Sequence, residues 1–155
     1  MTHIFSRFLV VSFAFFAAMG VPVMAAGTSD GSSAATAPAA ATYAQAKAVV
    51  DAGNFKEALP MLVMLTRNDA KNADAWNLLG FTYRKLGQLD DSSKAYLKVL
   101  TINPNHLGAL EYQGELFITT GKIAMAKANL DKLHTLCGTC EEADDLAKAM
   151  KAVGA

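Results

Sequence analysis

The chain contains the stretch GNFKEA at residues 53–58, GQLDDS at residues 87–92 and GKIAMA at residues 121–126. Each stretch has the same order of residue types: a glycine, a polar residue, an apolar residue, two residues compatible with a helix, and a small residue. Both intervals between the stretches are 34 residues. Self-similarity at a fixed period of roughly 20–50 residues indicates a repeat architecture. The sequence therefore predicts three structural units of one kind.

The three glycines that open these stretches lie between segments with helical apolar periodicity. A turn between two antiparallel helices often needs a residue with a positive φ angle, which glycine adopts without a Cβ clash. Each unit is therefore predicted to be a helical hairpin. Because no segment shows the alternation of apolar and polar residues that a half-buried strand requires, the fold class is predicted to be all-α.

The middle unit carries the most complete pattern of aromatic, apolar and small residues. It contains Trp76-x2-Leu79-Gly80-x2-Tyr83, then Ser92-x3-Tyr96, and then Pro104. This pattern resembles the tetratricopeptide repeat (TPR) family, and the first and third units resemble it more weakly. The resemblance implies an α-solenoid of three TPR-like helical hairpins, at about residues 39–72, 73–106 and 107–139.

Several residues of the pattern are expected to belong to the core. Gly80 and Gly114 are expected to let the facing helix approach closely, because a glycine has no side chain to hold it away. Trp76, Tyr83 and Tyr96 are expected to fill the space between helices. These five residues are therefore predicted to pack rather than to bind a partner.

The residues after the third unit predict one more helix. The sequence Thr139-Cys140-Glu141-Glu142 is predicted to form a capping box at its start. A solenoid exposes apolar surface at its open end, so a terminal helix with a polar outer face is needed for solubility. Residues 140–152 are predicted to be this capping helix, which completes a TPR domain at residues 42–155. The residues at helical spacing are Cys140, Ala143, Leu146, Ala147 and Met150.

The first residues of the chain are typical of a secretory signal. An arginine precedes an apolar run at residues 8–19, which a glycine and a proline then interrupt. The sequence predicts a signal peptide at residues 1–25, cleaved after Ala25 or Ala26, and a flexible linker rich in alanine, serine and glycine at residues 26–41. The protein is expected to be periplasmic or secreted, without stable membrane insertion after cleavage. An uncleaved inner-membrane anchor is the alternative.

The charge balance and the motif content exclude several classes of function. The chain has 14 Lys and Arg residues against 14 Asp and Glu residues, so it lacks the positive charge of a nucleic-acid-binding protein. The sequence contains no G-x-S-x-G, no H-E-x-x-H and no phosphate-binding glycine loop. His106 and His134 are expected to have structural roles at helix ends. We therefore expect no enzymatic activity, no cofactor and no metal ion.

Cys137 and Cys140 form a C-x-x-C pair in a chain that is expected to enter an oxidising compartment. A structural disulfide that sets the angle of the last helix is the first interpretation. The next residue is Glu141, so the C-x-x-C-H pattern of c-type haem attachment is missing. A thiol-disulfide or metal-handling function is the alternative, because a C-x-x-C pair at a helix start can have a lowered thiol pKa.

The TPR resemblance implies a binding groove on the concave side, lined by the first helix of each hairpin. Phe81 and Tyr43 are the expected aromatic anchors of a partner. Arg84 is expected to orient a partner carboxylate. An ordinary solvated helix surface is the alternative interpretation of the same residues. The predicted groove residues are Tyr43, Lys47, Asn77, Phe81, Arg84, Glu111, Glu115 and Ile118.

Together these features predict a non-catalytic periplasmic adaptor that binds a segment of another protein or a peptide in its groove. Some TPR proteins hold a terminal carboxylate with a clamp of Lys, Asn and Arg. Here Glu111 and Glu115 stand where positive charge would be needed, so this mode is not expected. The alternatives are a thiol or metal function of the two cysteines, and self-association through the ends of a short solenoid.

Overall fold

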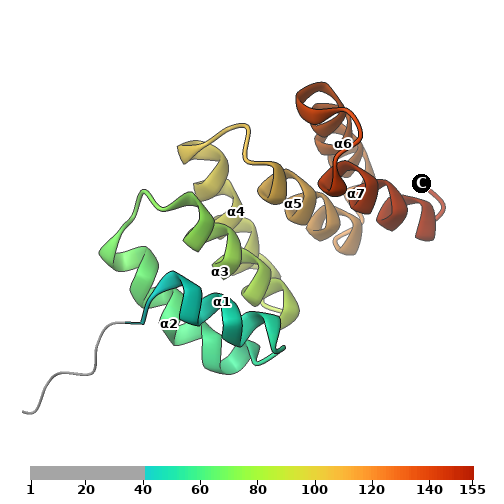
Figure 1. Cartoon of the computed structure of the whole chain (residues 1–155). Helices are drawn as coiled ribbons and strands as arrows, with labels where there is room; N and C mark the ends of the chain where they lie inside the picture. The colour runs from blue at the N-terminus through green and yellow to red at the C-terminus, as the bar shows by residue number, and fades with distance from the viewer. Residues whose placement is uncertain (1–40) are drawn as a thin grey trace, which may run out of the picture. The chain divides into compact units, whose positions relative to one another are not determined.

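A computed structural model describes residues 41–155 of the chain (Figure 1). All regular structure in this range is helical, which confirms the predicted all-α fold class. No helix in the range is long and apolar enough to cross a membrane. The predicted signal peptide and all but the last residue of the predicted linker lie outside the described residues. The helices are α1 (Tyr43–Asp51), α2 (Phe55–Asn68), α3 (Ala73–Lys85), α4 (Leu89–Ile102), α5 (Leu107–Thr119), α6 (Ile123–Cys137) and α7 (Glu141–Ala152).

The helices follow one another at a fixed interval. Helices α3, α5 and α7 begin at residues 73, 107 and 141, and helices α2, α4 and α6 begin at residues 55, 89 and 123, so both series advance by 34 residues. The pairs α1–α2, α3–α4 and α5–α6 pack as hairpins (Figure 1). Helix α7 starts where the first helix of a fourth unit would start. The predicted α-solenoid of helical hairpins is therefore confirmed.

The first helices of the units form one layer. Helix α1 contacts α3, α3 contacts α5, and α5 contacts α7. Within residues 41–155, each of the helices α2, α4 and α6 contacts only the first helices on either side of it in the chain. Every contact between successive units therefore involves the first helix of the later unit.

The turn inside each hairpin has the same geometry. The glycine of each turn has a φ angle between 72° and 77°, a value that residues with a Cβ rarely adopt. The N–H of the residue after each glycine donates to the carbonyl five residues earlier, which satisfies a carbonyl at the helix end. These bonds run from Asn54 to Val49 (3.0 Å), from Gln88 to Tyr83 (2.9 Å) and from Lys122 to Phe117 (2.7 Å).

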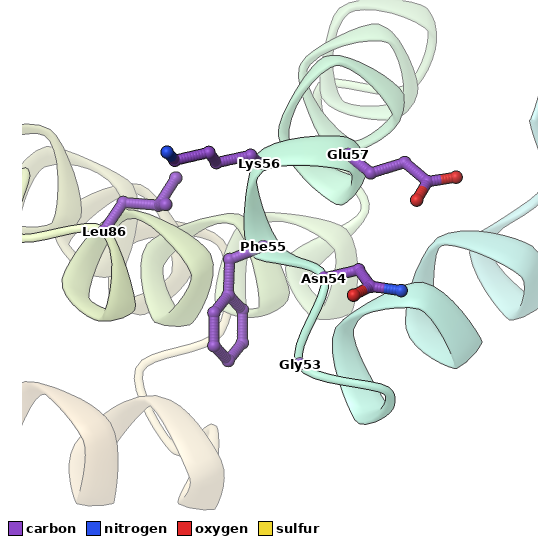
Figure 2. A pocket seen from close by; sticks show the side chains of 6 residues that line it. All are labelled: Gly53, Asn54, Phe55, Lys56, Glu57 and Leu86. Atoms are coloured by element: carbon purple, nitrogen blue, oxygen red, sulfur yellow. The ribbon is translucent and has the colours of Figure 1, made fainter.

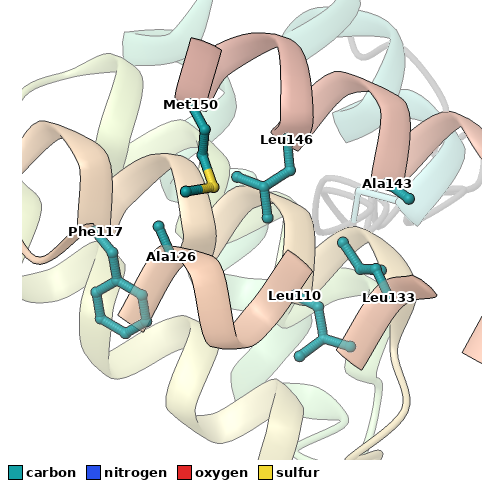
Figure 3. Packing of buried hydrophobic residues seen from close by; sticks show 7 residues of the cluster. All are labelled: Leu110, Phe117, Ala126, Leu133, Ala143, Leu146 and Met150. Atoms are coloured by element: carbon teal, nitrogen blue, oxygen red, sulfur yellow. The ribbon is translucent and has the colours of Figure 1, made fainter. Parts of the chain in front are cut away.

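Three apolar clusters fill the space between the helices. The first joins α1, α2 and α3 around Leu62 and Leu79, and the second joins α4 and α5 around Tyr96 and Leu116. The third holds α7 against α5 and α6, and burying each of its large side chains is worth about 1.5–3 kcal/mol. Figure 3 shows Leu146 and Met150 projecting from α7 toward the other members of this cluster. Its buried members are Leu110, Phe117, Ala126, Leu133, Ala143, Leu146 and Met150.

Two glycines allow helices to approach each other closely, as the sequence predicts. A Cβ atom on Gly80 would lie 2.7 Å from Cε1 of Tyr96, a fully buried residue of α4. A Cβ atom on Gly114 would lie 2.5 Å from Cδ2 of Leu146 on α7. Carbon atoms do not approach one another this closely without repulsion. The Ser92 hydroxyl also donates to the carbonyl of Gly80 at 2.8 Å, which the close approach permits.

Side chains cap three of the first helices. Thr42 forms a capping box with Gln45 at the start of α1. The Oδ1 atom of Asn72 accepts from a backbone N–H in the first turn of α3 at 2.9 Å. His106 caps α5 through Nδ1 at 3.1 Å, and its Nε2 lies 3.0 Å from Oδ1 of Asp74. The predicted structural role of His106 at a helix start is therefore confirmed.

The predicted capping box at Thr139-Cys140-Glu141-Glu142 is wrong. The N-cap of α7 is Cys140, and its side chain makes no capping hydrogen bond. The sulfur of Cys140 lies at bonding distance from that of Cys137, and Thr139 stands one residue before the cap position. The cap position is therefore occupied by a cysteine, whose sulfur is a poor acceptor for the backbone N–H groups of the first turn of α7. The threonine hydroxyl that could accept such a bond lies one residue before the cap position.

We predict that Gly80→Ala destabilises the chain by about 1–3 kcal/mol, because the new Cβ meets the buried Tyr96 ring. Helix propensity alone would predict that the substitution stabilises the chain, since alanine is favoured over glycine by about 1 kcal/mol inside a helix. Urea denaturation followed by circular dichroism measures the difference. Gly108→Ala is the matched control, because its Cβ would lie 3.1 Å from Nδ2 at the end of the Asn77 side chain and would otherwise make only ordinary contacts with His106. Equal stability of the two variants would contradict this account of the packing.

Candidate protein-binding face

Three aromatic rings lie next to one another where α2, α3 and α5 meet. The ring centroid of Phe81 on α3 is 4.9 Å from that of Tyr112 on α5, and 6.0 Å from that of Phe55 on α2. Tilted and edge-on arrangements of this kind are the ones that aromatic pairs prefer. All three side chains are only partly buried, so the cluster has a surface that a partner can contact.

Two cations flank this aromatic cluster. The Cζ atom of Arg84 lies 5.5 Å from the centroid of Phe81 and 5.8 Å from that of Tyr112, and the Nζ atom of Lys85 lies 5.3 Å from Phe81. These distances are within the range of cation–π attraction. Arg84 is also paired with Glu115, and its side chain is only 14% exposed. Its guanidinium is therefore engaged inside the chain, whereas we predicted that it would orient a partner carboxylate.

A buried carboxyl group lies beside the cluster, on α5. Glu111 is 8% exposed. Burial, together with the negative charges of Glu115, Asp145 and Glu142, raises the pKa of Glu111 to about 8 against the opposing effect of Arg84. Burial and the charges of Glu111 and Glu115 likewise raise the pKa of Tyr112 to about 12. The α5 side of the cluster is therefore acidic, and α7 contributes to this acidity.

The other predicted groove residues lie in different settings. Partial burial and the charge of Asp74 raise the pKa of Tyr43 on α1. The Nζ atom of Lys47 pairs at 2.6 Å with an aspartate one turn later. The buried Oδ1 atom of Asn77 has no hydrogen-bond partner within residues 41–155. Ile118 packs against the apolar cluster that holds α7.

The structure brings four of the eight predicted groove residues into one region, and we call this region the first-helix face. Phe55, Lys85 and Tyr112 belong to it but were not predicted. Lys85 and Tyr112 each follow a predicted residue by one position, so a stripe two residues wide along each first helix would have included them. Phe55 belongs to a second helix, so the spacing along the first helices does not indicate it. The first-helix face consists of Phe55, Phe81, Arg84, Lys85, Glu111, Tyr112 and Glu115.

An open pocket of about 430 Å³ adjoins the aromatic cluster through Phe55. Phe55 and Leu86 supply its apolar surface, and Figure 2 shows the Lys56 side chain extending toward Leu86. The Gly53 turn borders the pocket, so no side chain fills this part of its rim. A large apolar side chain of a partner would fit a pocket with these walls.

The two cysteines lie apart from this face, at the junction of α6 and α7. Cys137 is the last residue of α6, and the Cα atoms of Cys137 and Cys140 are 5.7 Å apart. Glu141, Glu142 and Asp144 occupy the first turn of α7. No group of three His, Cys, Asp or Glu residues within residues 41–155 is arranged to hold a metal ion.

Comparison with known proteins identifies a tetratricopeptide repeat at residues 73–106, which contain the hairpin α3–α4. The uncharacterized protein ycf37 of Pyropia yezoensis is 32% identical over 69 residues, which cover 44% of this chain and 39% of that protein. This chain thus spans well under two thirds of that relative. No function is stated in the name of the relative.

Solved structures share the fold of the described residues. MamA (41-end) from Desulfovibrio magneticus RS-1 superposes with a TM-score of 0.58 at 22% identity, covering 61% of this chain and 53% of MamA. The Yersinia enterocolitica type III secretion chaperone SycD, in complex with a peptide of the translocator YopD, has a TM-score of 0.64 at 17% identity. That match covers 72% of this chain and 88% of SycD. At these identities the likeness shows a common fold.

We predict that Glu111 makes the stability of the chain depend on pH. Its folded-state pKa of about 8 lies above the ordinary value of 4.5, so between these values the folded chain retains a proton that the unfolded chain releases. This stabilisation is fully present below pH 4.5 and is lost as the pH rises through 8. The full shift corresponds to about 5 kcal/mol, and solvent screening of the carboxyl oxygens reduces this, so we expect the free energy of unfolding to fall by about 1–3 kcal/mol across this window.

Urea denaturation at several pH values measures this loss, and Glu111→Gln should remove it. Asp144→Asn, at an exposed position of α7, is the charge-matched control and should retain the loss. If the stability of Glu111→Gln falls with pH as steeply as that of the unsubstituted chain, the buried carboxyl group is not the cause.

Proposed function

We propose that this chain, which contains a tetratricopeptide repeat at residues 73–106, is a non-catalytic periplasmic adaptor that binds a segment of another protein on its first-helix face. The observation that carries the proposal is the cluster of Phe55, Phe81 and Tyr112, whose rings are packed together and yet partly exposed beside two cations. Aromatic residues and arginine carry a disproportionate share of the binding energy at protein interfaces.

The surroundings of the cluster support an extended or helical peptide as the occupant. The pocket beside Phe55 offers an apolar site for one side chain, and Phe81 offers a ring next to it. The rings are held by neighbouring helices, so little side-chain freedom is lost when a partner binds. The SycD structure holds a peptide of the translocator YopD on the same fold, and we propose the same class of partner here.

The periplasmic location rests on the predicted signal peptide. We expect the chain recovered by osmotic shock of its own cells to lack residues 1–25 or 1–26, because the small residues at this position suit a signal peptidase. Intact-mass spectrometry of the recovered chain measures the loss. A full-length chain that remains with the inner membrane would contradict the proposed location and favour the uncleaved anchor.

We predict that Phe81→Ala weakens partner binding by about tenfold or more, because the ring lies at the centre of the cluster. The test is photo-crosslinking in the envelope fraction, followed by an affinity measurement with each captured partner. Leu97→Ala is the matched control. Leu97 is a large apolar residue on α4 and is 63% exposed, but it lies outside the first-helix face.

Lys85→Glu provides a second variant that does not remove core packing, because Lys85 is exposed. Thermal unfolding shows whether each variant is folded. Capture that depends on Phe81 and Lys85 but not on Leu97 supports the proposal. Capture that all three variants retain would contradict it, and so would a chain whose mass in solution shows it bound only to copies of itself.

The position of the two cysteines keeps a thiol-disulfide function as a second candidate. Cys140 is the N-cap of α7, and a helix N-terminus lowers the pKa of a thiol placed there. Glu141, Glu142 and Asp144 in the same turn oppose this effect, because a thiolate beside carboxylates is repelled. We therefore propose that the pair is a structural disulfide that fixes the start of α7.

We predict that the double variant Cys137→Ser, Cys140→Ser loses about 2 kcal/mol of stability or less, because the closed ring is short. Partner capture should be unchanged. Urea denaturation measures the first effect, and the crosslinking assay measures the second. Capture through mixed disulfides that disappears in this variant would make the thiol-disulfide function the better account.

A further inference from the structure

The first-helix face has a surplus of negative charge at its α5–α7 end. Glu111, Glu115, Glu142 and Asp145 all act on this region, and Arg84 is the cation that reaches it from α3. Arg84 is paired with Glu115, and Asp145 is paired with Lys148 at 2.7 Å. These two ion pairs leave the carboxyl groups of Glu111 and Glu142 without a countercharge. The cations of the aromatic cluster lie on α3, so the face is polarised along its length.

Glu111 is the member of this group that points to a ligand. More than nine tenths of the residue is buried, but its carboxyl oxygens are not among the buried, unpartnered polar atoms of residues 41–155, so they reach the surface, where a partner can contact them. A largely buried carboxylate is stabilised by a hydrogen bond or an opposite charge. Glu111 stands at the position that corresponds, 34 residues earlier, to Asn77, whose buried Oδ1 is without a partner within residues 41–155. The Oδ1 atom of Asn77 and the ionised carboxylate of Glu111 are acceptors, so a donor from a partner would suit both.

The geometry favours an organic cation over a metal ion. No three carboxyl groups in the described residues are close enough to hold one metal ion. A guanidinium or ammonium group on a flexible stem needs only one or two carboxylates, and its stem can lie on aromatic rings. Tyr112 and Phe81 present such rings beside Glu111, with centroids 4.9 Å apart.

We propose that the α5–α7 end of the first-helix face binds an arginine or lysine side chain of the partner segment, with Glu111 and Glu142 as its counterions. This inference rests on the proposed function and specifies the chemistry of its partner. The partner is a basic peptide segment, and its apolar side chains lie toward α3 and the Phe55 pocket. An acidic segment would place its carboxylates against Glu111 and Glu142 and would be repelled.

Binding of such a cation is coupled to the protonation of Glu111. At neutral pH the buried carboxyl group holds a proton, because its pKa is about 8. A cation placed beside it stabilises the carboxylate, so the proton leaves as the peptide binds. The groups that act on Glu111 are Glu115 on its own helix, Glu142 and Asp145 on α7, and Arg84 on α3. The affinity should therefore rise with pH until Glu111 is ionised in the free chain.

The test begins with a displayed library of random peptides, which is selected on the full purified chain and on two double variants. The first double variant is Glu111→Gln with Glu142→Gln, and the second is Asp131→Asn with Asp144→Asn. The second double variant replaces the same number of carboxyl groups, at exposed positions of α6 and α7. We expect binders of the unsubstituted chain to be several-fold enriched in arginine and lysine. The enrichment should disappear with the first double variant and persist with the second.

The selected peptides are then compared with versions in which citrulline replaces arginine, which keeps the shape but removes the charge. We expect about tenfold weaker binding of the citrulline peptides. Calorimetry in buffers of different ionisation enthalpy should show that about one proton is released per arginine peptide at pH 7. Glu111→Gln should abolish this release while still binding the peptide.

The outcomes separate this inference from the proposed function. Binders that depend on Phe81 but show no preference for arginine over citrulline would overturn the inference and leave the adaptor function standing. Equal loss of the preference in both double variants would also overturn it, because a diffuse charge effect would then suffice. If no peptide binds in a Phe81-dependent way, both proposals fail.

Discussion

The close approach of helices at Gly80 and Gly114 is the contact on which the arrangement of the chain depends. At Gly80 the buried ring of Tyr96 occupies the place of a side chain, and the hairpin α3–α4 closes around it. The residue 34 positions after Tyr96 is Leu130, which is smaller. At Gly114 the place is taken instead by Leu146, which comes from α7. The space beside the equivalent glycine is therefore filled by a residue of the same hairpin at Gly80, and by a residue of α7, the helix after the hairpin, at Gly114.

This difference decides what α7 does. Leu146 brings α7 against α5, and the apolar cluster around Leu133 and Met150 holds it there. Because α7 is amphipathic, the contact that buries Leu146 also carries Glu142 and Asp145 toward Glu111. A helix predicted to cap the open end of a solenoid thus also gives the adjoining surface its negative charge.

The first-helix face joins two kinds of chemistry that are usually found apart. Around Phe81 the rings and cations attract one another and form a surface that is organised before any partner arrives. Around Glu111 the carboxyl groups repel one another, and protonation relieves this repulsion. A partner that is apolar at one end and cationic at the other would match both regions. The polarity of the face, more than its size, is what would set the direction of a bound segment.

The sequence by itself determined the all-α class, the 34-residue period, the glycine turns and the close contacts at Gly80 and Gly114. These features are local or repeat along the chain, so a pattern of residue types is enough to predict them. It also led to Phe81, Arg84, Glu111 and Glu115, because one helix face follows from helical spacing. Only the tertiary structure placed Phe55 and Tyr112 beside Phe81, engaged Arg84 with Glu115, and buried Glu111 near α7. Contacts between helices depend on which side chain fills each space, and the period of the sequence carries no information about that choice.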